Sequence, residues 1–143
     1  IISMTKNINY IFLFARVAIA LGFLSAVADR FGIWTLLLGS ENVVWGNMES
    51  FTAYTGVLLP WVPKSFLPLF AWTATIAEIV LGVLLLIGFQ KRLVALVSGI
   101  LLLTFALAMV TALNVKAPFD YSVFAAAACA FLLYKENDSK VGK

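Results

Sequence analysis

Four long apolar runs constrain the fold of this chain more than any other feature. The runs cover about residues 8–28, 68–89, 93–113 and 119–134. A helix that crosses a bilayer needs about 20 predominantly apolar residues, and a lysine at the end of the shortest run, Lys135, can extend its reach to the interface. Because a backbone in hydrocarbon must satisfy its own hydrogen bonds, we expect one all-α domain, an integral membrane four-helix bundle.

Composition agrees with this class. The chain has 143 residues, of which 63% are hydrophobic and 12% charged, whereas soluble domains carry about 25% charged residues. Its mean hydropathy is +1.03. We find no segment typical of a cleaved signal peptide, so the first apolar run is expected to stay as a span.

The distribution of Lys and Arg predicts orientation, because cytoplasmic loops are enriched in them. One side of the expected bundle carries six of these residues: Lys6, Lys91, Arg92, Lys135, Lys140 and Lys143. The other side carries three: Arg30, Lys64 and Lys116. We therefore expect both termini in the cytoplasm and a multi-pass protein. The net charge of +3 then reflects orientation in the membrane and predicts no nucleic-acid partner.

The long connection at 29–67 is expected to lie on the outer side and to contain a short amphipathic helix. Apolar and small polar side chains recur there at helical spacing in "NMESFTAYTGVLL", and "PWVPKSFLP" ends the pattern. Six residues could form a polar outer mouth under this loop: Asp29, Arg30, Trp34, Trp45, Asp120 and Tyr121. The alternative is interfacial anchoring by tryptophan together with ordinary charges at helix ends.

Glu78 stands near the middle of the second run, where an ionised carboxylate needs a partner. The other charge well inside a span is Arg16. Counted from the inner ends of their runs at about 1.5 Å per residue, the two lie about 12 and 16 Å deep. We therefore predict a buried Arg16–Glu78 ion pair between antiparallel spans. Two interpretations stay open: a lock that fixes helix register, or a ligand or proton site.

The side chains for self-contained catalysis are missing. The chain has no histidine and one cysteine, Cys129, which leaves no haem ligand, no zinc set and no thiol pair. Cys129 in "AAAACAFLL" is expected to be a small packing residue. We expect no catalytic residue, no metal site and no intrinsic cofactor, so a redox role would need a quinone or a cofactor held by a partner.

Two segments, "FARVAIALGFLSAVADRFG" and "IAEIVLGVLLLIGFQKRLVALVSG", resemble the DoxX family of small four-helix bacterial inner-membrane proteins. In the first span the resemblance is carried by Arg16, Gly22 and Arg30. In the second it is carried by Glu78, Gly82, Gly88 and Arg92. The ending "KAPFDYSVFAAAACAFLL" is typical of one branch. Many members have glycine and lysine where this chain has "ADRFG", so a role for that lysine is not carried over.

The resemblance implies an accessory or assembly subunit of a redox-linked, quinone-associated complex in the bacterial inner membrane. More distant four-helix relatives act as cargo receptors or assembly chaperones, and fold is a weak guide to function. The expected partners are the lipid bilayer and either another membrane protein or further copies of this chain. The alternatives are a small proton-coupled transporter and a protein that binds a lipophilic small molecule.

Overall fold

The computed structural model describes the backbone of residues 2–141 and the side chains of residues 10–139. Within this part the chain is all-α. The elements are α1 (Ile2–Arg30), α2 (Ile33–Leu38), η1 (Ser40–Asn42), α3 (Met48–Leu58), η2 (Lys64–Phe66), α4 (Leu67–Ile87), α5 (Lys91–Ala112), α6 (Ala117–Asp120) and α7 (Val123–Val141). Three described helices, α1, α4 and α5, are long and apolar enough to cross a membrane. The expectation of a helical, membrane-associated protein is confirmed at this level.

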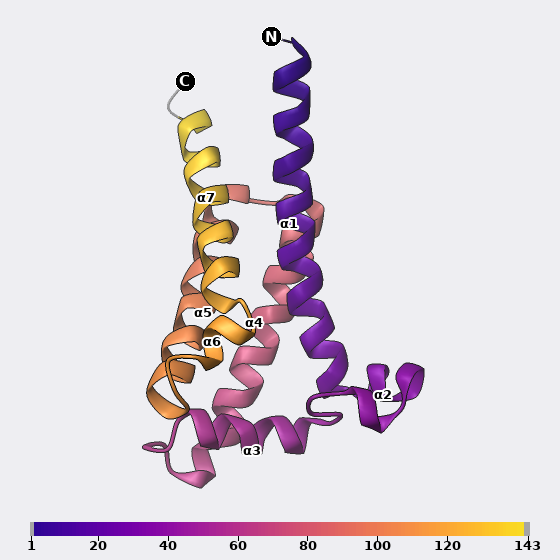
Figure 1. Ribbon diagram of the computed structural model, residues 1–143, viewed down its shortest axis with the longest axis vertical. Helices are drawn as coiled ribbons and strands as arrows, with labels where there is room; N and C mark the ends of the chain where they lie inside the picture. The colour runs from indigo at the N-terminus through magenta and orange to yellow at the C-terminus, as the bar shows by residue number, and fades with distance from the viewer. Residues whose placement is uncertain (1, 142–143) are drawn as a thin grey trace.

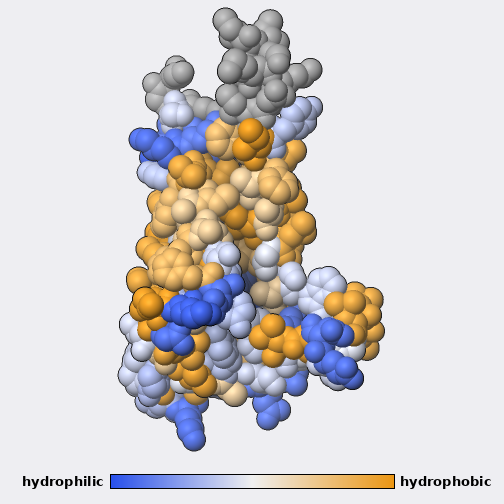
Figure 2. All heavy atoms as spheres, in the orientation of Figure 1, coloured by the Kyte–Doolittle hydropathy of each residue, from blue (hydrophilic) through white to orange (hydrophobic). Residues whose placement is uncertain are grey.

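The long helices α1, α4, α5 and α7 extend along the longest axis of the molecule, and both chain ends lie at the same end (Figure 1). α5 packs mainly against α7, and α1 packs mainly against α4. At the other end, α3 lies across the helices, while α2 projects to the side (Figure 1). The visible face carries a broad apolar band with hydrophilic residues above and below it (Figure 2).

Local sequence signals explain where α4 begins and ends. Pro68 occupies the first turn, where a missing N–H leaves no helical bond unmade. Gly88 ends the helix in the left-handed conformation with φ of 74°, and its N–H donates to the Leu84 carbonyl at 3.0 Å. Phe89 N–H donates to the same carbonyl at 3.2 Å. This glycine C-cap turns the chain sharply into α5.

Small residues allow the helices to approach closely. Ala20, Ala71, Ala106 and Ala130 have no exposed surface, and Ala95 has almost none. At Gly82, an added Cβ would lie 2.9 Å from Leu24 Cγ. Close packing of this kind is how helices associate where hydrophobic burial provides no driving force between them.

The last expected run, 119–134, is divided in the structure. α6 ends at Asp120, Ser122 adopts a positive φ of 55°, and α7 then continues to Val141. The polar end of α7 includes Glu136 and Asp138, so this helix is less apolar than α1, α4 and α5. At the other boundary, α1 extends beyond residue 28 to Arg30.

Candidate functional site

A buried ion pair joins the end of α1 to the middle of α4. Arg30 Nη1 donates to Glu78 Oε2 and, at 3.0 Å, to Thr75 Oγ1. The two charged side chains are 2% and 4% exposed. The Thr75 hydroxyl donates in turn to the Ala71 carbonyl at 2.8 Å, so it accepts from Arg30 with its proton already engaged. Each charge in this interior therefore faces an opposite charge, and Arg30 has Thr75 as a further polar partner, although its Nε is buried without one.

Aromatic rings from α3 and the loop before it cover the Arg30 guanidinium. Its Cζ lies 3.6 Å from the centroid of the Phe51 ring and 5.2 Å from that of Trp45. The two rings meet edge to face, with centroids 5.0 Å apart. A cation over aromatic faces is stabilised by the ring quadrupole, more strongly when water is excluded. α3 and the loop before it therefore cover the guanidinium side of the ion pair.

The predicted Arg16–Glu78 pair is wrong. Arg16 Nη1 lies 3.1 Å from the position that a Cβ on Gly88 would occupy, and Gly88 is about 15 Å along α4 from Glu78 at 1.5 Å per residue. That prediction assumes that residues 8 and 89, the inner ends of the two runs, are level. In the structure Arg16 lies beside Gly88 instead, so about four turns of α1 extend past the end of α4. This register brings Arg30 to Glu78.

Asp29, next to Arg30, holds the loop after η1. Its carboxylate accepts backbone N–H bonds from Val44 at 3.0 Å, Trp45 at 3.2 Å and Gly46 at 3.0 Å. Gly46 has φ of 76°, a conformation that favours glycine. Both residues therefore contact Trp45. Asp29 binds its backbone N–H, and the Arg30 guanidinium lies over its ring.

The six residues of the predicted outer mouth do not all meet. Trp34 Nε1 donates to the Ser25 carbonyl and hydroxyl at 3.1 and 3.0 Å. Asp120 forms an exposed ion pair with Lys116 one turn away. Tyr121 is 69% exposed. Burial raises the pKa of Tyr54 on α3, and the charge of Tyr121 raises it further by a smaller amount.

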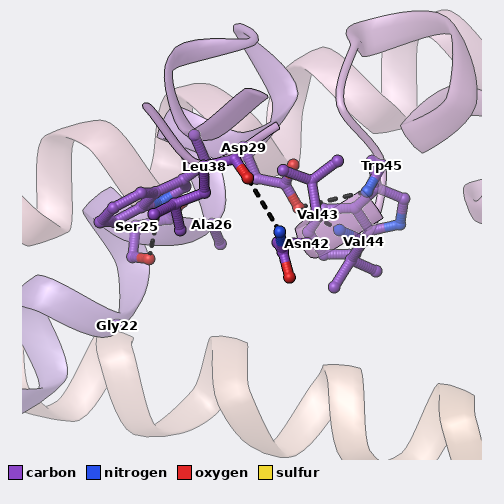
Figure 3. A pocket seen from close by; sticks show the side chains of 10 residues that line it. Gly22, Ser25, Ala26, Asp29, Leu38, Asn42, Val43, Val44 and Trp45 are labelled. Carbon is purple, nitrogen blue, oxygen red and sulfur yellow. Dashed lines mark hydrogen bonds between the residues drawn. The ribbon is translucent and has the colours of Figure 1, made fainter. Parts of the chain in front are cut away.

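A groove of about 390 Å³ runs along the C-terminal part of α1 (Figure 3). It is lined by Gly22, Ser25, Ala26, Asp29, Trp34, Leu38, Asn42, Val43, Val44 and Trp45. Trp34 Nε1 already donates to Ser25 and Asn42 Nδ2 donates to the Leu38 carbonyl, whereas Trp45 Nε1 is buried and has no partner. Most of the accessible lining is apolar. The groove therefore combines an apolar surface with one hydrogen-bond donor that has no partner.

Sequence reasoning missed Thr75 and Phe51 as neighbours of the charges. Thr75 precedes Glu78 by three residues and so shares its helix face, which is a usable signal. The contact between Phe51 and Arg30 depends on how a loop folds back and has no local signal. No family model, no curated protein and no solved structure matches the chain.

Proposed function

We propose that this is a four-span membrane protein of the DoxX type that acts as an accessory or assembly subunit of a redox-linked membrane complex, without catalysis of its own. The family assignment depends on the sequence motifs around Arg16, Glu78 and Gly88. The fourth span would be α7, which packs along α5. An even number of spans agrees with the chain ends lying together (Figure 1), and the Lys and Arg counts favour a cytoplasmic location for both in a bacterial inner membrane.

The observation that carries the proposed role is the enclosure of Arg30 and Glu78. A proton-coupled transporter needs its membrane carboxylate to exchange protons with water on each side in turn. Here Glu78 is paired with Arg30, bonded through it to Thr75, and separated from the outer end by Phe51 and Trp45. This arrangement supports a structural lock, which is what an accessory protein requires.

The exterior supports an association within the membrane. Large apolar side chains on α4 and α5 are exposed, among them Trp72, Ile76, Val83, Ile100 and Leu107. Lipid chains or the helices of a partner can cover such a surface equally well. The groove on α1 favours a second candidate function, the binding of a lipophilic molecule with an extended apolar chain, because its free lining is apolar (Figure 3).

Two measurements test the proposal. Purification from native membranes in mild detergent, with mass spectrometry of proteins and lipids, should give a stoichiometric membrane-protein partner. A bound lipophilic molecule without a protein partner would favour the second candidate. In parallel, the purified protein in liposomes should produce no proton flux above that of empty liposomes. Proton-coupled flux that Glu78→Gln abolishes would show instead that the protein is a transporter.

A further inference from the structure

A second cavity, of about 340 Å³, lies at the end of the molecule opposite α3. Side chains from α1, from the start of α5 and from the polar end of α7 line it. Its charged lining residues are Arg16, Lys91 and Glu136, and Asn137 and Leu133 complete the α7 side. None of these groups takes part in the Arg30–Glu78 site.

Two cations converge beside this cavity. Arg16 Nη1 and Lys91 Cε lie 3.1 and 3.2 Å from the same point, the position that a Cβ on Gly88 would occupy. The positive charges of these two side chains repel each other, and an anion between them would offset the repulsion. The carbonyl end of α4 offers a partial negative charge equivalent to about half an electron, which offsets the repulsion in part.

Arg16 is also short of hydrogen-bond acceptors. Its Nε is buried and has no partner, and none of the described side chains forms an ion pair with it. Buried polar atoms normally have partners, so an unpartnered one beside a cavity indicates where a ligand acceptor belongs. Glu136 reduces the positive charge of the lining without cancelling it, since the lining carries two cations and one carboxylate.

The geometry points to an anionic phospholipid whose head-group phosphate binds between Arg16 and Lys91. A guanidinium presents several N–H donors in a plane and suits phosphate oxygens, while an ammonium group adds a point charge. Leu13 lines the cavity and is exposed, and exposed Phe14 and Leu93 follow the lining residues Leu13 and Lys91 closely in sequence, so apolar surface is available to acyl chains. Basic pockets between spanning helices at a membrane border bind anionic head groups. The inference depends on α1 and α5 crossing the membrane and is independent of the accessory role.

The test is a lipid titration of the purified full-length protein in detergent, with bound lipid counted by native mass spectrometry. Phosphatidylglycerol should bind more tightly than phosphatidylcholine, which carries a phosphate but no net charge. Arg16→Gln and Lys91→Gln should each weaken phosphatidylglycerol binding about fivefold, the value of one basic residue near an anionic surface. Glu136→Gln should strengthen it, a gain that structural damage would not produce.

Arg92→Gln is the matched control. It removes the same charge one residue away, but Arg92 is 48% exposed, is paired with Asp138 at 2.7 Å and lies over the Tyr134 ring. The affinity of this variant for phosphatidylglycerol should change less than about twofold, because Arg92 is already paired with Asp138 and does not line the cavity. Lys91 is exposed, so the Lys91→Gln variant should fold. If Arg16→Gln does not fold, Lys91→Gln alone tests the proposal.

Three results would overturn the assignment. Equal losses in Lys91→Gln and Arg92→Gln would mean that general surface charge attracts the lipid. Equal affinities for phosphatidylcholine and phosphatidylglycerol would mean that the two cations do not select lipids by net charge. Displacement of phosphatidylglycerol by millimolar inorganic phosphate would mean that the cavity is a site for the soluble anion. We expect no displacement, because the acyl chains should contribute to binding.

Discussion

At the scale of single residues, the charge of Glu78 depends on a chain of neighbours rather than on one partner. Arg30 neutralises it, Thr75 fixes the guanidinium from the same helix face, and Phe51 covers the guanidinium from outside. In a medium of low dielectric constant the attraction within the pair is strong, and so is the penalty for leaving one charge alone. The two charges should therefore behave as a unit in mutagenesis.

Removal of either charge should destabilise the fold strongly. Glu78→Gln leaves Arg30 unpaired and Arg30→Gln leaves Glu78 unpaired, so each should lower the free energy of unfolding by about 3 kcal/mol or more. The double variant Arg30→Leu/Glu78→Met leaves no buried charge and should be closer to the original protein than the sum of the single losses. Denaturant unfolding in detergent micelles, followed by Trp fluorescence, measures these differences.

Arg16→Met is the control for this comparison, because it removes an arginine from the same helix, α1. Since Arg16 lies beside Gly88 and not beside Glu78, its loss should cost much less than that of Arg30. If Arg16→Met proves as damaging as Arg30→Gln, or if the double variant loses as much as both single variants together, the ion pair is not the unit described here.

Asp29 supports a different prediction, a local one. Asp29→Ala removes the acceptor of three backbone N–H groups in the loop at 44–46, and the loss of bonds to a charged group should cost about 2 kcal/mol. Limited proteolysis should then cut the α2–α3 segment faster. Glu41→Ala removes the same charge from an exposed position in that segment and should leave the rate unchanged. Equal rates for Asp29→Ala and the original protein would contradict this role.

At the scale of elements, the glycines differ in whether close helix packing leaves room for a side chain at their position. A Cβ on Gly99 would lie 2.7 Å from Cε1 and 2.8 Å from Cδ1 of Phe131 on α7, whereas one on Gly22 would meet nothing within 4 Å. An overfilled contact costs about 1–3 kcal/mol, and Ala is about 1 kcal/mol more favourable than Gly in a helix. The α5–α7 interface should therefore be sensitive and the middle of α1 tolerant.

Gly99→Ala should accordingly lower the unfolding temperature in detergent, and Gly22→Ala should leave it unchanged or raise it. The two substitutions add the same methyl group to the same residue type, so the difference isolates the packing of Phe131. Two shifts of the same sign and size would show that α5 and α7 do not pack as described.

The elements were predictable where the signal is contained in one segment. Runs of about 20 apolar residues indicate α1, α4 and α5 directly, and Gly88 indicates the turn between the last two. The register of α1 against α4 was not predictable, because it depends on contacts such as Gly82 against Leu24 and on how far α1 extends beyond its apolar run. Because this register was unknown, the prediction paired Glu78 with Arg16 rather than with Arg30. The Asp29 loop depends similarly on a positive φ at Gly46, which local sequence only permits.

At the scale of the whole molecule, we predict that α7 crosses the membrane with α1, α4 and α5. Its packing along α5 and the chain ends at one end of the molecule predict that it does (Figure 1). In a Cys129→Ala background, single cysteines at Glu41 and Val115, both exposed, should react with a membrane-impermeant maleimide in right-side-out vesicles. A cysteine at Ser139 should react only after the membrane is permeabilised, because the positive-inside rule predicts a cytoplasmic location for that end. Reaction of the Ser139 and Val115 positions from the same side would mean that α7 lies along the surface, and the exposed apolar face of α5 would then need another cover.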